Sequence, residues 1–343
     1  MSEQTLSVQG IVELASAYYG SAVLFAALDV SLFTLIQREE NRISADSLAN
    51  VSGLDPRGLR LLLDACVAVG LLLKEGESYS NTPAASGTLV AGAPQDLTRA
   101  VRYNCDVYPA WGRLAELVKS GHPVEAPEIH LGEDAGRTRR FALAMHGRAL
   151  GIGRTVVPLL GLRGCRRLLD LAGGPGTYAL LMAQAHPELM CVTIDLPAVS
   201  AVAAELIGEA GLSGRVACRA GDYHTDTYDA AAFDAVTIFG ALHQESPEQI
   251  VAILKRARHA LKPRGVIYIL DMMTDVTHTR PAFSALFAVN MALTTHNGWV
   301  FSDKELHGWL REAGFEACET SVVPPPMPHW LVSARTPGHL LRQ

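Results

Sequence analysis

The glycine-rich turn after residue 171 constrains the fold of this chain more than any other feature. Residues 168–176 read Leu-Leu-Asp-Leu-Ala-Gly-Gly-Pro-Gly, an apolar strand that runs into a turn, and a helix is expected to begin at Thr177. Glycine tolerates the positive φ angles of such a turn and lets a ligand approach the backbone closely. A second apolar segment ends at Asp195, where a carboxylate can accept both hydroxyls of a ribose. The turn therefore predicts a nucleotide site at one edge of a sheet.

Strand-like and helix-like segments alternate after Arg166, which is typical of a mostly parallel, doubly wound α/β sheet. The last two strand candidates predict a terminal hairpin. Strands are expected over residues 167–171, 190–194, 216–220, 235–239, 266–271, 317–322 and 329–333. Helices between them are expected to include residues 177–185, 247–261 and 303–313.

Before residue 160 the apolar residues recur at spacings of three and four, the period of a helix. Residues 7–36 follow this pattern, and we expect Gly20 and Asp29 to break the run. The first part of the chain is therefore predicted to be mostly helical.

Residues 44–81 predict a helix, a turn, a second helix and a hairpin, the order of a winged helix. Ser44 is expected to cap the first helix, and Asp55 with Pro56 opens the second, which ends at Gly70. The hairpin is expected over residues 71–74 and 79–81, with its turn at residues 75–77.

A winged helix often binds DNA, but phosphate binding needs a basic excess that this one lacks. The charged residues of its second helix and wing are Arg57, Arg60 and Lys74 against Asp55, Asp64, Glu75 and Glu77. The whole chain has a formal net charge of −6. A dimerisation and pocket-lid module is therefore favoured, and a DNA-binding regulator with a nucleotide domain as its sensor is the alternative.

The first ten residues lack the basic and apolar segments of a secretory signal. No stretch offers roughly 20 consecutive apolar residues, so no membrane span is expected. The six cysteines are scattered without a C-x-x-C pair, which argues against structural zinc and against a disulfide framework. These features predict a cytoplasmic protein with no bound metal and no nucleic-acid or membrane partner.

The glycine turn alone also fits an NAD fingerprint, because Gly174-x-Gly176-x-x-Ala179 has the required spacing. Three features favour S-adenosylmethionine (SAM). Asp170 stands inside the strand, where it can balance the sulfonium-bearing amino acid moiety. Asp222 follows the third strand and suits the amino group of adenine. The terminal hairpin is a feature that dehydrogenases usually lack. An NAD(P)-dependent oxidoreductase is the alternative class.

Five segments carry a resemblance to a known family: LLDLAGGPGTY, TIDLPAV, AGDYHTD, FGALHQESPEQ and KPRGVIYILDMM. Their order and spacing resemble the SAM-dependent small-molecule O-methyltransferases, which include the caffeate, hydroxyneurosporene and acetylserotonin enzymes. The resemblance covers nearly the whole chain. It implies a Rossmann-like class I methyltransferase domain preceded by a mostly helical winged-helix dimerisation domain, in a homodimer joined through the N-terminal domain. The domains expected are residues 1–100 for dimerisation, 101–160 as a helical linker and acceptor-pocket segment, and 161–343 for SAM binding and catalysis.

The same resemblance implies the site. His243 falls where the family has its general base, and Asp271 falls near the carboxylate that orients this histidine. No metal is implied, and the product of the cofactor is S-adenosylhomocysteine (SAH). The residues implied to bind the cofactor are Asp170, Gly173, Gly174, Gly176, Asp195, Leu196, Asp222, Tyr223 and Phe239.

The chemistry of methyl transfer fits these residue types. A sulfonium methyl group is already activated, so the enzyme mainly aligns a nucleophile and excludes water. A phenol titrates near pKa ~10, so a histidine within hydrogen-bond reach can assist its deprotonation. Two departures weaken the comparison. Gln244 and Glu245 stand where many relatives have aspartate and an aromatic residue, and Val300 stands near the place of a second carboxylate in the plant enzymes.

The acceptor is expected between the two domains, on aromatic and sulfur-containing side chains. An inward-pointing arginine among Arg102, Arg148 and Arg154 would bind a substrate carboxylate in bidentate fashion. A thioether needs no deprotonation, so S-methylation of a small hydroxy acid ranks as an alternative to O-methylation. The candidate lining residues are Arg102, Tyr103, Trp111, Phe141, Met145, His146, Phe287, Met291, His296 and Asn297.

Overall fold

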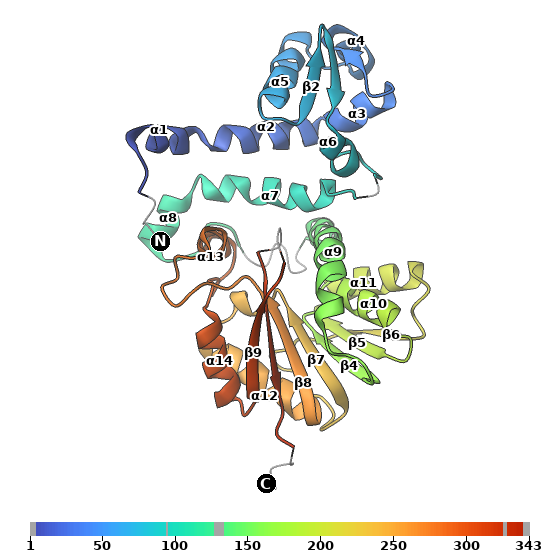
Figure 1. Cartoon of the computed structure of the whole chain (residues 1–343), viewed down its shortest axis with the longest axis vertical. Coiled ribbons are helices and arrows are strands. Elements are labelled where there is room, and N and C mark those ends of the chain that lie inside the picture. The colour runs from blue at the N-terminus through green and yellow to red at the C-terminus, as the bar shows by residue number, and fades with distance from the viewer. Residues whose placement is uncertain (1–4, 94, 127–133, 325–327, 339–343) are drawn as a thin grey trace. The chain divides into compact units, whose positions relative to one another are not determined.

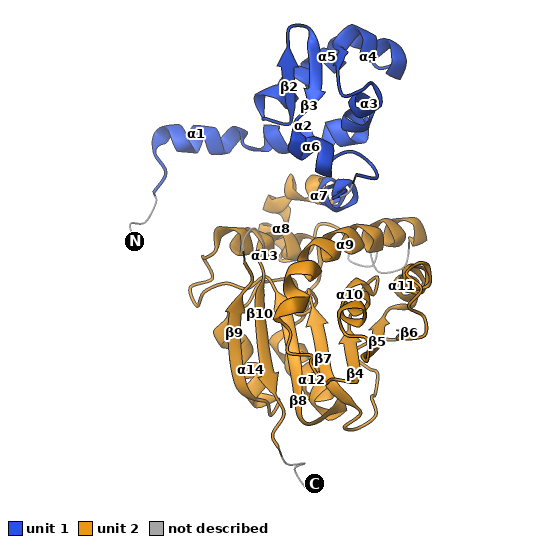
Figure 2. Ribbon diagram, turned by 45° about the vertical axis from the view of Figure 1, so that its right-hand side comes forward, with its two compact units in different colours: residues 1–106 blue, residues 107–343 orange. Residues whose placement is uncertain are grey.

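The chain divides into two compact units, Met1–Asp106 and Val107–Gln343, which Figure 2 shows in separate colours. Each unit has its own sheet and its own hydrophobic core, and the larger sheet belongs to the second unit. The residues described by this computed structural model are 5–93, 95–126, 134–324 and 328–338.

The first unit is mostly helical, as predicted. Ser44 accepts a hydrogen bond from the backbone N–H of Ser47 at the start of α4. Asp55 accepts one from Gly58 at the start of α5, and Pro56 is the first residue of that helix, so both predicted helix starts are confirmed. The helices are α1 Val8–Ser16, α2 Tyr18–Asp29, α3 Leu32–Arg38, α4 Ala45–Ser52, α5 Pro56–Ala68 and α6 Pro83–Thr88, and α7 Thr98–Trp111 runs on into the second unit.

A small antiparallel sheet completes the first unit, with the strand order β1-β3-β2. Strands β2 (Leu72–Glu75) and β3 (Ser78–Asn81) form the predicted hairpin, and β1 (Ile43–Ser44) pairs with β3. Helices α2 to α6 and the hairpin enclose a core of buried apolar side chains. Its fully buried members include Leu32, Phe33, Ile36, Leu48, Leu63, Leu72 and Tyr79.

The N-terminal helices correct one expectation. The helical run breaks at Ala17 rather than at Gly20, which lies inside α2; a glycine within a helix costs about 1 kcal/mol, which the apolar residues around it can offset. Asp29 ends α2 as predicted. The segment Val8–Asp29 is long and apolar enough, by length and composition only, to cross a membrane, with a mean hydropathy of 1.6 over 18 of its residues. The expectation that the chain has no membrane span stays a prediction.

The second unit contains the predicted α/β sheet, with the strand order β6-β5-β4-β7-β8-β10-β9 (Figure 1). Strands β6, β5, β4, β7 and β8 run parallel, and β10 pairs antiparallel with β8 and with β9. The terminal hairpin is therefore confirmed. The strands are β4 Arg167–Leu171, β5 Met190–Asp195, β6 Val216–Ala220, β7 Phe233–Phe239, β8 Leu261–Asp271, β9 Glu316–Val322 and β10 Trp330–Arg335.

Helices cover both faces of this sheet. Side chains of α9, α10 and α11 form a core on one face, and side chains of α12 and α14 form a core on the other. This arrangement buries both sides of the parallel strands, which accounts for their continuous apolar sequences. The helices are α8 Leu114–Ser120, α9 Ala135–Val156, α10 Thr177–Ala185, α11 Pro197–Glu209, α12 Pro247–Ala260, α13 Ala282–Thr294 and α14 Asp303–Glu312, with short 3₁₀ turns η2 Val157–Leu159 and η3 Leu242–Gln244.

Two predicted boundaries in this unit were wrong. Leu261 begins β8 instead of ending α12, because its backbone is extended and Pro263 disfavours a helical conformation at Lys262. Strand β8 therefore begins five residues before the predicted start at Val266. His329 lies just before β10 rather than in it. The other predicted strands and helices occupy their expected places within one or two residues.

Candidate active site

The glycine turn leads from β4 into α10 at the carboxyl edge of the sheet. A Cβ atom on Gly173 would lie 1.9 Å from Thr193 Oγ1 and 2.5 Å from Asp170 Oδ2, so only glycine fits there. Gly174 and Gly176 adopt φ angles of 56° and 71°, in the left-handed region that favours glycine. The backbone can therefore lie close to a ligand, as the sequence predicted.

Asp170 lies beneath this turn. Its carboxylate accepts hydrogen bonds from Thr237 Oγ1 at 2.6 Å and from Thr193 Oγ1 at 3.3 Å, and the residue is 1% exposed. Burial raises the pKa of Asp170 to about 7. The carboxylate thus joins β4 to its two neighbouring strands, a role that the sequence alone did not indicate.

Asp195 ends β5 beside the turn. Its two carboxylate oxygens accept from the backbone N–H groups of Gly174, at 2.7 Å, and Leu196, at 2.8 Å. Burial raises the pKa of this carboxyl group above its ordinary value. Each oxygen keeps a further lone pair, so a side chain held in this way can accept hydroxyl groups of a ribose.

Asp222 and Tyr223 follow β6, the next strand along the same edge. Asp222 Oδ1 accepts from the backbone N–H of His224 at 2.8 Å and lies 2.8 Å from His224 Nδ1. The Tyr223 hydroxyl donates to Glu245 Oε1 at 2.6 Å. The three expected cofactor acids therefore come from three neighbouring strands, β4, β5 and β6, and these groups fit a nucleoside with an attached amino acid.

Phe239, the remaining cofactor candidate, ends β7 and is 7% exposed. Its ring packs edge-on against Tyr178, with the ring centroids 4.9 Å apart. It is thus part of the core beneath the turn.

His243 and Asp271 meet at the ends of β7 and β8. His243 belongs to η3, and its Nδ1 lies 2.6 Å from Asp271 Oδ1. The residues are 7% and 1% exposed. Asp271 Oδ1 also accepts from the backbone N–H of Met272 at 2.8 Å, so this carboxylate is held firmly. With Nδ1 occupied, Nε2 is the nitrogen that can receive a proton from another molecule.

The segment after β8 contacts His243 through one side chain and one backbone group. The Phe287 ring meets the imidazole edge-on at 5.1 Å between centroids, and the backbone N–H of Trp299 donates to the His243 carbonyl at 3.0 Å. Val300 is buried at 3% exposure, so the place of the second carboxylate in the plant enzymes holds an apolar side chain here.

The acceptor candidates are divided between the two units. Arg102 and Tyr103 belong to the first unit, and the others belong to the second. Within the second unit Trp111 Nε1 donates to Asn290 Oδ1 at 2.9 Å, and His146 Nδ1 lies 2.8 Å from Thr177 Oγ1. Phe141 and Met145 are half-buried, Met291 is buried, and His296 and Asn297 are exposed.

The three arginine candidates differ in their surroundings. Arg102 donates to Asp29 at 3.2 Å and to the Leu28 carbonyl at 2.8 Å within the first unit. Arg154 is exposed. Arg148 is half-buried. Burial lowers the pKa of His329 to about 4, and the charge of Arg148 acts in the same direction. Within the second unit, Arg148 is therefore the arginine candidate that acts on a buried polar group.

Sequence reasoning missed two residues beside the site. His224 and Glu245 lie 2.8 Å apart between Nε2 and Oε2, and both contact residues expected to bind adenine. The sequence contained a signal for Glu245, because the family resemblance places an aromatic side chain of many relatives at this position. Its partner could not be identified without knowing that the segments after β6 and β7 meet.

The same fold is known from solved structures. Human N-acetylserotonin methyltransferase, solved in complex with SAM, matches with a TM-score of 0.87 and 23% identity, over 98% of this chain and 100% of that one. This likeness shows that the chain shares the fold of that protein.

Sequence comparisons identify the family. Residues 121–316 match the O-methyltransferase domain and residues 12–91 match the O-methyltransferase dimerisation domain. The tetracenomycin polyketide synthesis 8-O-methyl transferase of Streptomyces glaucescens is 32% identical over 92% of this chain and 94% of its own length. The 3-hydroxy-5-methyl-1-naphthoate 3-O-methyltransferase of Streptomyces sahachiroi is 30% identical over 90% of each. The chain belongs to the O-methyltransferase family, and the oxidoreductase alternative is excluded.

Proposed function

We propose that the protein transfers the methyl group of SAM to a phenolic hydroxyl of a small fused-ring aromatic acceptor, with His243 as the general base. The observation that carries this proposal is the 2.6 Å contact between His243 Nδ1 and the buried carboxylate of Asp271. The acceptor class rests on the two Streptomyces relatives, whose names specify a polyketide and a naphthoate.

The pair suits the removal of a phenolic proton. SAM, when bound, supplies an electrophilic methyl group on a sulfonium. Asp271 holds the imidazole in the tautomer with a proton on Nδ1, so that Nε2 is the basic nitrogen. As Nε2 receives the proton from the acceptor, the nearby carboxylate stabilises the imidazolium. The phenolate oxygen is then the stronger nucleophile.

The surroundings of the pair favour this reaction over S-methylation. The Phe287 ring beside the imidazole and the burial of His243 and Asp271 give the pair an apolar environment, which strengthens the electrostatic effect of Asp271 on the imidazole. A thioether acceptor would need no base, and the intact histidine–carboxylate pair would then have no task. The missing second carboxylate leaves His243 and Asp271 to act as a pair alone.

The cofactor would lie along the ends of β4, β5 and β6. Gly173, Gly174 and Gly176 would hold its methionine part on their backbone, with Asp170 supporting the turn from below. Asp195 and Leu196 would hold the ribose. Asp222 and Tyr223 would contact the adenine, and Phe239 would pack beneath the site. The residues that remain proposed for the acceptor are Tyr103, Trp111, Phe141, Met145, His146, Met291, His296 and Asn297.

The first unit would serve as a winged-helix dimerisation domain. Several large apolar residues of α1 and α2 are exposed, as a surface covered by a second copy would be. These residues are Val8, Ile11, Val12, Leu14, Tyr18 and Tyr19. A dimer interface on this surface would also account for the apolar composition of Val8–Asp29 without a membrane, in keeping with a cytoplasmic enzyme.

The test is incubation with methyl-deuterated SAM and a panel of hydroxynaphthoates, hydroxylated polyketides and thioether hydroxy acids, followed by mass spectrometry. Label on a phenolic oxygen is expected. Label on a thioether alone would overturn the base assignment, while the fold and the cofactor would stand.

A further inference from the structure

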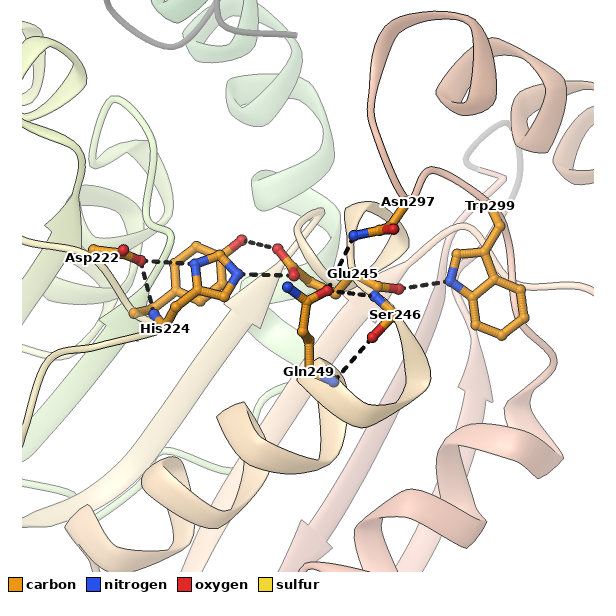
Figure 3. Close-up of polar contacts among 8 residues, drawn as sticks. Asp222, His224, Glu245, Ser246, Gln249, Asn297 and Trp299 are labelled. Atoms are coloured by element: carbon orange, nitrogen blue, oxygen red, sulfur yellow. Dashed lines mark hydrogen bonds and ion pairs between the residues drawn. The ribbon is translucent and has the colours of Figure 1, made fainter. Parts of the chain in front are cut away.

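His224 lies between two carboxylates at the adenine end of the proposed cofactor site (Figure 3). Its Nδ1 is 2.8 Å from Asp222 Oδ1, and its Nε2 is 2.8 Å from Glu245 Oε2. A neutral imidazole has one N–H donor and one acceptor nitrogen, whereas the imidazolium has two donors. Only the protonated ring can therefore donate to both carboxylates at once.

Glu245 is the buried member of this cluster, with a side chain only 6% exposed. Its second oxygen accepts from the Tyr223 hydroxyl at 2.6 Å, and the Tyr223 and His224 rings stack with centroids 4.4 Å apart. A buried carboxylate is costly unless it is paired and hydrogen-bonded, and these two partners meet that need. Glu245 thus holds two consecutive residues of the segment after β6.

The backbone of Glu245 is fixed from the other side. Its carbonyl accepts from Trp299 Nε1 at 2.8 Å, and its N–H donates to the Leu242 carbonyl of η3 at 3.1 Å. Ser246, the next residue, caps α12 in a capping box with Gln249, to which Asn297 also donates (Figure 3). The carboxylate therefore projects from a rigid segment that begins next to His243.

Asp222 receives its orientation from His224. Both contacts of Asp222 with His224, from the backbone N–H and from the ring, fall on Oδ1. Oδ2 is therefore the oxygen that would accept the 6-amino group of adenine. If the ring of His224 loses its proton or is removed, Asp222 loses a charged partner that holds it in this orientation.

We propose that Glu245 and protonated His224 are positioning residues for the adenine of the cofactor, and that they set both the affinity for it and the selectivity for its 6-amino group. The proposal rests on the proposed cofactor site. It adds that the carboxylate of Glu245 gives this chain a charged link between the segment after β6, which contains Asp222 and His224, and the segment that follows the proposed base His243.

The charges around His224 determine the direction of its pH dependence. Burial lowers the pKa of His224, but the hydrogen bonds and charges of Glu245 and Asp222 outweigh it, so the pKa is raised above 6.5. Burial raises the pKa of Asp222, but the hydrogen bonds from His224 and the charges of His224 and of Arg256, on α12, outweigh it, so the pKa is lowered. Burial raises the pKa of Tyr223, and the charges of Glu245, Asp195 and Asp222 add to this effect. The protonated ring of His224 therefore donates to both Asp222 and Glu245 at and below a pH near 6.5, and this is lost as the pH rises through the raised pKa of His224.

The experiment is isothermal titration of the full chain with SAH and with its 6-oxo analogue, S-inosylhomocysteine, from about pH 6 to about pH 9. In the wild type the Kd for SAH should rise about 10-fold over this range, and the preference for SAH over the analogue should fall. His224→Gln and Glu245→Gln should bind SAH at every pH as weakly as the wild type does at high pH, so their Kd should not change with pH. Gln is close in shape to Glu, so Glu245→Gln removes mainly the charge.

His278→Gln is the matched control, because His278 pairs with Glu305 at 3.5 Å and its other ring contacts are with Thr274 and the Val300 carbonyl, not with Asp222 or Glu245. It should keep the wild-type Kd and pH profile. Thermal unfolding without ligand shows whether each variant is folded, and if both fail to fold the wild-type pH profile decides alone. A wild type that binds SAH with a constant Kd and a constant preference over the analogue would overturn the inference and leave the proposed function intact. A wild type that does not bind SAH would overturn the proposed function itself.

Discussion

At the scale of single residues, Asp271 acts on His243 through one oxygen only. Oδ1 contacts the imidazole and accepts from Met272, whereas Oδ2 is buried without a hydrogen-bond partner among the residues described. An ionised carboxylate with one unsatisfied oxygen gains from a neighbouring positive charge. An imidazolium formed by the proposed proton transfer would provide that charge, which supports the proposal that His243 is the base.

His243→Ala should therefore lower kcat for a phenolic acceptor by at least ~100-fold, the usual contribution of a general base. Asp271→Asn should lower kcat strongly as well, because an amide can hold the wrong tautomer of His243. The SAH dissociation constant should not change in either variant. Stopped assays with labelled SAM and calorimetry with SAH measure the two quantities. Full turnover in His243→Ala would remove this residue from the role of base.

At the scale of elements, the turn between β4 and α10 depends on the close approach of β5. A Cβ on Gly173 would collide with Thr193 of β5 and with Asp170 of β4. Gly173→Ala should therefore displace the turn, weaken SAH binding by ~100-fold or more and destabilise the protein by about 2 kcal/mol. Calorimetry and thermal unfolding measure both effects.

Gly208→Ala, within α11, is the control for this substitution. No atom lies within 4 Å of the position of its Cβ, so it should leave SAH binding unchanged and stabilise the helix by up to ~1 kcal/mol. Equal SAH affinity in Gly173→Ala and in the wild type would mean that the cofactor does not bind at this turn.

The sequence predicted most helices and strands, because these depend on neighbouring residues. It did not predict the contacts between elements that lie far apart in the chain. The caps Ser44 and Asp55, and the apolar strands of the second unit, depend on neighbouring residues, so the sequence indicates them directly. The contact of Glu245 with His224 depends on the order β6-β5-β4-β7, which brings the ends of strands from different parts of the chain to one edge. His243 and Asp271 were identified through a family resemblance and not through local pattern.

At the scale of the whole molecule, the exposed apolar surface of α1 and α2 predicts the oligomeric state. Val12 is 59% exposed, and it lies where the match to the dimerisation domain begins. If a second copy covers this surface, Val12→Glu places an unpaired carboxylate in an apolar interface. The cost of several kcal/mol should raise the dimer dissociation constant by at least ~100-fold.

Val51→Glu is the matched control, because Val51 lies in the same unit on α4 and is 60% exposed. Light scattering coupled to size-exclusion chromatography should give a dimer for the wild type and for Val51→Glu, and a monomer at micromolar concentration for Val12→Glu. Flotation with lipid vesicles separates this prediction from the other interpretation of Val8–Asp29, a membrane-seeking helix. A monomeric wild type that floats with vesicles would contradict the dimer, because the apolar surface would then be covered by lipid and not by a second copy of the chain.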